Sequence, residues 1–169
     1  MKTWIVFLRA VNVGGTGKLP MVELRQMCEA LGFKNVKTYI ASGNIVLTSK
    51  QSKRAVQQAL EMRLEKYMGK PVGVRVLSAA ELRDLVDQSP FADADPKKAT
   101  AVLLAGPVPA DAISQARHRQ DEQMATGQRV IYVHYPSGMG RSRLSIPAAA
   151  DGTARNMNTL RKMLEIADS

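Results

Sequence analysis

The sequence has one cysteine, two histidines and few aromatic residues among its 169 positions. A single cysteine, Cys28, excludes an internal disulfide and any metal site built from several cysteines. His118 and His134 have no cysteine or histidine partner at the spacing of a zinc site. We therefore expect neither a metal nor a resident cofactor.

Long apolar runs are also missing, since no stretch approaches the roughly 18 residues of a membrane-spanning helix. The first apolar stretch ends at Arg9, which is too short for a signal-peptide core, and no small-residue cleavage site follows it. Apolar residues make up 45% and charged residues 23% of the chain, a composition typical of folded globular proteins. We expect a cytoplasmic protein with no membrane partner.

The usual catalytic patterns are absent as well. The sequence has no G-x-S-x-G elbow and no pair of carboxylates beside its basic loops. Its glycine-rich loop is not a Walker A motif, because Asn12 and Leu19 occupy positions where that motif has glycine and serine or threonine. The segment 44–48 lacks the base-stacking aromatics of an RNA-recognition motif, which excludes that module. No catalytic residue is predicted.

The net charge of +9 lies entirely in the first half of the chain. Residues 1–77 carry thirteen basic and four acidic side chains, whereas residues 78–169 carry eleven of each. Such a positive field attracts phosphates, nucleotides and nucleic acid. The alternative is that the lysines are a solvated surface that keeps the protein in solution.

Hydrophobic periodicity predicts six elements in the first half, in the order strand, helix, strand, strand, helix, strand. The predicted elements span 3–9, 20–31, 36–41, 44–49, 50–68 and 72–77. This order is that of the ferredoxin-like fold. Both alternating faces of the first strand are apolar, which predicts a central strand covered on both sides.

The second half reads as a smaller α+β unit. A capping box of Ser78 and Glu81 opens a predicted helix over 78–88, and a polar stretch follows at 89–98. Further strands are predicted at 100–105 and 129–135, and further helices at 110–119 and 155–167. We expect an α+β protein in which a ferredoxin-like βαββαβ subdomain, residues 1–88, carries a smaller α+β subdomain, residues 89–169, packed on it.

Three polar loops are candidates for ligand binding. In the first, over 9–18, consecutive glycines allow backbone N–H groups to converge, and the following helix start adds positive potential. The alternative is a long turn with structural glycines. The candidate residues of this loop are Arg9, Asn12, Gly14, Gly15 and Lys18.

The second candidate is the turn at Ser42 and Asn44, for which a plain hairpin turn is the alternative. The third combines Arg141 and Ser142 with a later pair, Arg155 and Asn156, at the start of the last predicted helix. A cation at a helix start opposes the helix dipole, and an anion bound beside Arg155 would remove that conflict. The alternative is a solvated arginine.

Several motifs together resemble the family called domain of unknown function 1697. They are Phe7–Gly15 with Lys18 and Pro20, Leu31–Phe33, Val36–Ile40, Ser42–Asn44, Gly140–Ser142 and Thr153–Thr159. The sequence departs from the family at Ala10, where glycine is usual, and at Ala154 and Met157, where threonine and tryptophan are usual. The resemblance implies an α+β fold with a ferredoxin-like part, and no established activity, cofactor or catalytic residue.

The leading hypothesis is a module that binds a phosphate-bearing ligand, either a nucleotide or a nucleic-acid backbone, in a basic cleft formed by these loops. One alternative is an enzyme acting on a phosphorylated or carboxylated metabolite, with Arg9, Arg141 and Arg155 binding the substrate. A further alternative is a protein-interaction domain, which would present a flat apolar patch.

Overall fold

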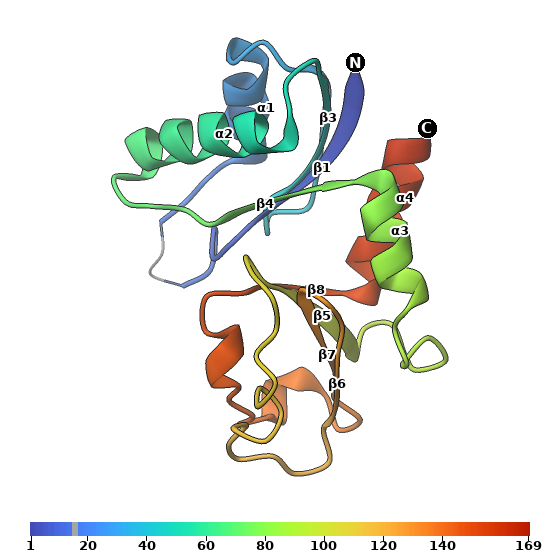
Figure 1. The fold of residues 1–169 in the computed structure, drawn as a ribbon. Helices are drawn as coiled ribbons and strands as arrows, with labels where there is room; N and C mark the ends of the chain where they lie inside the picture. The colour runs from blue at the N-terminus through green and yellow to red at the C-terminus, as the bar shows by residue number, and fades with distance from the viewer. Residues whose placement is uncertain (15–16) are drawn as a thin grey trace. The chain divides into compact units, whose positions relative to one another are not determined.

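A computed structural model describes residues 1–14 and 17–169 of the chain (Figure 1). The chain forms two compact units, one of Met1–Leu82 with Lys162–Ser169 and one of Arg83–Arg161. The division thus falls a few residues before the expected boundary at 88, and the last residues of the chain join the first unit. None of the helices within the described residues is long and apolar enough to cross a membrane.

The first unit is built on a four-stranded antiparallel sheet. Its elements are β1 (Lys2–Leu8), α1 (Met21–Ala30), β2 (Lys34–Tyr39), β3 (Asn44–Ser49), α2 (Lys53–Met68) and β4 (Val74–Ser78). The strand order is β2-β3-β1-β4, with every neighbouring pair antiparallel. This order and connectivity are those of the ferredoxin-like fold, and the predicted fold is confirmed.

The core of this unit lies between the sheet and helices α1 and α2, which lie on one side of it (Figure 1). Trp4, Val6 and Leu8 of β1 point into this core. They pack with residues that recur at helical spacing in α1 and α2, namely Leu24, Met27, Cys28, Val56, Leu60 and Leu64. Ile5 and Phe7 are also buried, so β1 is covered on both faces as its sequence predicts.

Local capping signals set the helix boundaries. Ser52 accepts a hydrogen bond from the Ala55 amide at the start of α2, and Gly69, with φ 74°, ends that helix. At the start of α3 (Ala79–Asp87), Ser78 and Glu81 exchange the two hydrogen bonds of the predicted capping box. Partial burial favours a higher pKa for Glu81, but the hydrogen bonds from Lys53 and Ser78 outweigh it and lower that pKa.

The second unit contains another four-stranded antiparallel sheet, in the order β6-β7-β5-β8. Its strands are β5 (Ala99–Leu103), β6 (Gln123–Thr126), β7 (Val130–His134) and β8 (Thr153–Asn156), and α4 (Met157–Asp168) follows β8. Short 3₁₀ turns lie at Met139–Arg141 and Pro147–Ala149. One face of the sheet packs against the irregular segments around Ala112 and Ile146. Both units, and hence the protein, therefore belong to the α+β fold class.

The helix predicted over 110–119 is wrong. The segment forms successive turns instead, and Arg117 pairs with Ser145 in an isolated β-bridge. Two long-range contacts hold the segment in this form: Ala112 packs in the second core, and the Arg117 amide donates to the Ser145 carbonyl at 2.8 Å.

The last helix begins two residues later than predicted. Arg155 lies in β8, paired with Ala101 of β5, and α4 begins only at Met157. The pattern also predicted no strand at β6, which has only four residues and pairs with β7. β8 depends on β5, which is distant in sequence, whereas β6 pairs with the strand that directly follows it, with Thr126 opposite Ile131. Local propensity reports neither pairing.

Candidate functional site

The loop that follows β1 leaves the sheet between two glycine-containing segments. The Leu8 amide donates to the Gly43 carbonyl on one side, at 2.9 Å, and the Arg9 amide donates to the Gly73 carbonyl on the other, at 2.9 Å. A Cβ on Gly43 would lie only 2.9 Å from Leu8 Cβ, and the φ of Gly43 is 89°. The close approach of the turn to β1 therefore requires glycine at position 43.

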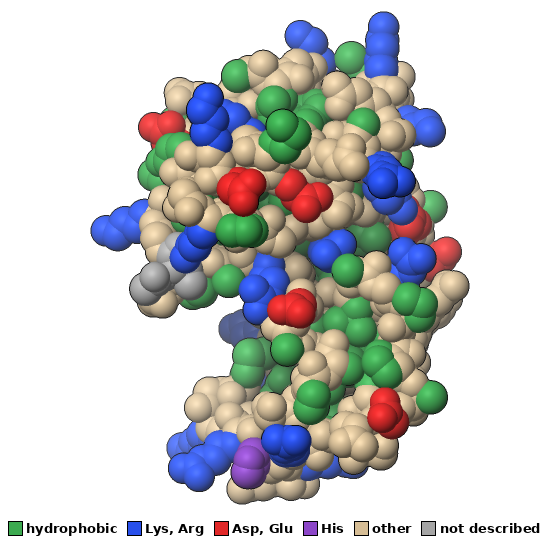
Figure 2. Space-filling view, turned by 60° about the vertical axis from the view of Figure 1, so that its left-hand side comes forward, with side chains coloured by type: hydrophobic (Ala, Val, Ile, Leu, Met, Phe, Trp, Pro, Cys, Tyr) green, Lys and Arg blue, Asp and Glu red, His purple; other side chains and the backbone are tan. Residues whose placement is uncertain are grey.

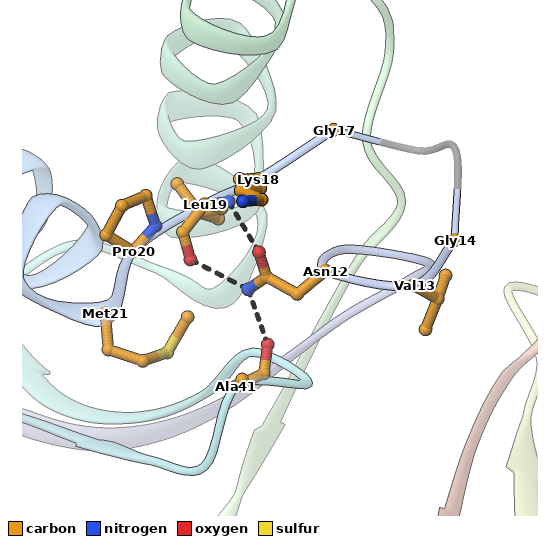
Figure 3. A pocket seen from close by; sticks show the side chains of 9 residues that line it. All are labelled: Asn12, Val13, Gly14, Gly17, Lys18, Leu19, Pro20, Met21 and Ala41. Atoms are coloured by element: carbon orange, nitrogen blue, oxygen red, sulfur yellow. Dashed lines mark hydrogen bonds between the residues drawn. The ribbon is translucent and has the colours of Figure 1, made fainter.

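Asn12 fixes the two ends of this loop to each other. Its side-chain oxygen accepts from the Leu19 amide at 2.6 Å, and its Nδ2 donates to the Leu19 carbonyl at 2.8 Å. The same Nδ2 donates to the Ala41 carbonyl at 2.7 Å (Figure 3). These three bonds, here called the Asn12 clamp, join the loop to the turn before β3, and the buried side chains of Val11 and Leu19 anchor both ends in the core.

A pocket of about 580 Å³ opens beside the Asn12 clamp (Figure 3). We call it the loop pocket. Its lining residues come from the loop, the start of α1 and the turn before β3: Asn12, Val13, Gly14, Gly17, Lys18, Leu19, Pro20, Met21 and Ala41. The volume lies within the range of about 300–1,000 Å³ typical of small-molecule sites.

Strained backbone is concentrated around the loop pocket. Ala10, Asn12 and Ile40 have φ of 56°, 57° and 50°, and only two other non-glycine residues of the described chain, Asn35 and His118, share this positive φ. For a β-branched residue such as Ile40 this conformation is unusual. Strain of this kind persists where the surroundings fix the backbone, and it is enriched at binding sites.

Lys18 supplies positive charge to the loop pocket. Its side chain is exposed and, among the residues that the structure describes, makes no ion pair. The adjacent start of α1 has Pro20 as its cap residue and no side-chain cap. The amides of its first turn are therefore open to an acceptor, while Glu23 of that turn is exposed and outside the pocket lining. Basic side chains are plentiful on the face drawn in Figure 2, where acidic ones are fewer.

The other candidates of the first unit lie close to the pocket without lining it. Asn44 is fully buried, and its Nδ2 donates to the Tyr39 carbonyl and to Ser42 Oγ, so both residues shape the turn. Arg9 is half-buried, with its side chain packed against Gly73. Gly15 lies outside the described residues.

In the second unit, the loop after β7 is held by internal hydrogen bonds. Ser142 donates to Glu122, a buried carboxylate that also accepts from the Gln120 amide at 2.6 Å. The hydrogen bond from Ser142 is the main cause of a lowered pKa at Glu122. Arg141 is exposed in the 3₁₀ turn.

Arg155 and Asn156 serve local structure at the junction of β8 and α4. Asn156 Oδ1 accepts from the Thr159 amide at 2.9 Å and caps α4. The Arg155 side chain is 9% exposed, and its guanidinium donates to the Ala154 carbonyl at 2.8 Å. Burial lowers the pKa of Arg155 to about 10, so the group remains a cation at neutral pH.

The structure thus gathers Asn12, Gly14 and Lys18 into one pocket. Sequence reasoning missed its apolar lining, although the aliphatic residues interleaved with the glycines of the loop were a usable signal. Cys28 is buried in the first core, and burial raises the pKa of its thiol to about 12. Within the described ranges 1–14 and 17–169, no group of three His, Cys, Asp or Glu side chains could hold a metal.

Comparison with known proteins supports the fold and leaves activity open. No curated protein matches the chain. A solved structure described as that of the conserved bacterial protein SP0830 from Streptococcus pneumoniae is similar, with a TM-score of 0.78 and 24% identity over 98% of each chain. The family model described as "Protein of unknown function (DUF1697)" matches residues 1–132, which include the loop after β1, α1, the turn before β3 and α2. The chain therefore belongs to that family.

Proposed function

We propose that the first unit binds a small phosphate-bearing ligand of about nucleotide size in the loop pocket. A nucleotide or a related metabolite suits a cytoplasmic protein, which is where we propose that the chain acts.

The observation that carries the proposal is the Asn12 clamp beside the loop pocket. All three hydrogen bonds of the clamp are made with backbone atoms of Leu19 and Ala41. The Asn12 side chain therefore fixes the shape of the loop and does not itself bind the ligand. A site whose walls are fixed in advance loses less conformational entropy when it binds. Ala10 and Ile40, both with positive φ, support the same reading, because strained backbone marks sites that the fold keeps in one shape.

Lys18 and the start of α1 account for the anionic part of the ligand. Lys18 brings a full positive charge to the pocket lining, and Met21 places the first turn of α1 there. Amides of a first helical turn together with a lysine are a recurrent arrangement for phosphate. The excess of basic residues in the first 77 positions adds long-range attraction for the same ligand.

The proposal is tested by calorimetric titration with mononucleotides and with short oligonucleotides, at low and at moderate salt. We expect mononucleotides to bind, and Lys18→Gln to weaken binding about tenfold while Lys18→Arg retains most of it. Lys50→Gln is the matched control, because Lys50 is exposed and follows β3 at the end of the sheet remote from the loop. Absence of binding at low salt, or equal losses in Lys18→Gln and Lys50→Gln, would overturn the proposal.

A further inference from the structure

The lining of the loop pocket is largely aliphatic, which restricts the ligand beyond its charge. Pro20, Met21 and Ala41 contribute hydrocarbon surface, and Val13, which is 53% exposed, adds more. Among the described lining residues, Lys18 is the one charged side chain. A ligand that fills the pocket therefore meets much more hydrocarbon than charge.

The neutral polar side chain of the lining is already satisfied by the protein. Asn12 donates to two carbonyls through Nδ2 and accepts the Leu19 amide through Oδ1. It has no N–H left with which to bind a ligand hydroxyl. A ligand hydroxyl that gives up water here therefore gains no donor from Asn12, whereas an apolar body gives up no hydrogen bond.

The positions of the side chains suggest how a two-part ligand would lie. In the view of Figure 3, Lys18 and Ala41 lie on opposite sides of the Asn12 amide, and Met21 lies on the α1 side of the pocket. Met21 is half-buried, and a methionine side chain adapts its shape to a flat apolar group. An anion at Lys18 would leave the rest of the ligand against Met21 and Ala41.

We infer that the loop pocket selects phosphate monoesters that carry an apolar or aromatic group, nucleotides included, over sugar phosphates without such a group and over inorganic phosphate. This inference rests on the proposed function and narrows it. The phosphate contacts Lys18 and the first turn of α1, and the apolar body covers the wall formed by Met21 and Ala41.

The test is a titration series in which the phosphate stays constant and the attached body changes. The probes are inorganic phosphate, ribose 5-phosphate, phenyl phosphate and 1-naphthyl phosphate. We expect affinity to rise in that order, with 1-naphthyl phosphate at least tenfold tighter than ribose 5-phosphate. Equal affinities for the three esters would overturn the inference and leave the proposed function standing, whereas absence of binding by every phosphate ester, nucleotides included, would overturn both.

A variant pair locates the apolar contact. Met21→Gln keeps the length and the helix propensity of the side chain while making the wall polar, and is expected to weaken 1-naphthyl phosphate at least fivefold and ribose 5-phosphate less than twofold. Val22→Gln, one residue along α1, is 58% exposed and outside the lining, and should change neither. Equal effects of the two substitutions would contradict the inference. If Met21→Gln does not fold, Ala41→Gln obstructs the same wall from an exposed position and should weaken 1-naphthyl phosphate in the same way.

Discussion

The loop after β1 and the loop after β7 both combine glycine with basic residues, and they use their polar side chains differently. In the first, one side chain, Asn12, makes the bonds that fix the backbone, while Lys18 stays exposed beside a pocket. In the second, Ser142 is bonded to the buried Glu122. Similar composition therefore produces a pocket in one region and an internally bonded loop in the other, because the outcome depends on partners distant in sequence.

The largest expected effect concerns the turn that supports the first loop. Gly43→Ala should lower the free energy of unfolding by about 2–4 kcal/mol. Alanine is strained at the positive φ of this position, and its Cβ would also lie too close to Leu8 Cβ. Urea unfolding followed by circular dichroism measures it. Gly32→Ala is the control, because Gly32 has a φ of 91° and no heavy atom within 4 Å of the added Cβ, and should cost about 1 kcal/mol. If Gly43→Ala and Gly32→Ala lowered the free energy of unfolding equally, the contact between the turn and β1 would not be tight.

The second prediction removes the Asn12 clamp. Asn12→Ala deletes three hydrogen bonds and should cost about 2–3 kcal/mol of stability, because each is worth about 1 kcal/mol net. It should also abolish nucleotide binding under conditions where the variant is still folded. Circular dichroism gives the first result and calorimetry the second. Unchanged nucleotide affinity in a folded Asn12→Ala variant would mean that the clamp does not set the shape of the pocket.

The third prediction applies the same kind of change to the second unit. Asn156→Ala removes the cap of α4 and should cost about 1 kcal/mol of stability. Nucleotide binding in the loop pocket should be unaffected, which separates Asn156 from Asn12. A loss of affinity as large as that of Lys18→Gln would place Asn156 in the binding machinery.

The smallest expected effect is a gain. Ala10 has a φ of 56° where the family usually has glycine. Ala10→Gly should stabilise the protein by about 0.5–1 kcal/mol, because glycine adopts this conformation without the steric cost that alanine has. For a chain of this length the gain corresponds to a rise in Tm of about 1–4 °C in a thermal melt. An unchanged or lower Tm would mean that the loop does not store strain at Ala10.

Local signals predicted the first unit well. The apolar stripes of α1 and α2, the capping box at Ser78 and the doubly apolar β1 each act within a few residues of sequence, and each is found in the structure. The second unit was predicted less well. Its short strand β8 exists because it pairs with β5, and the segment after Pro109 is held by Ala112 in the core and by Arg117 at Ser145.

At the candidate site too, local sequence predicted some features, and features that depend on distant contacts were missed. Sequence reasoning singled out Asn12 and Lys18 from the composition of their loop, and the structure places both at the loop pocket. The sequence alone does not show that the Asn12 side-chain amide forms hydrogen bonds with the backbone of Leu19 and Ala41, because these bonds depend on how the loop returns to the sheet. For the same reason it did not foresee that Asn44 would be buried.

The Asn12 clamp also has a consequence for protein engineering. Since one side chain ties Asn12 to Leu19, the chain between them is closed at its base, much as a short peptide is closed by cyclisation. Residues exchanged or added between these two points should alter the rim of the pocket while the sheet beneath keeps its register. The β1 loop is therefore a natural place to install new ligand specificity on this scaffold.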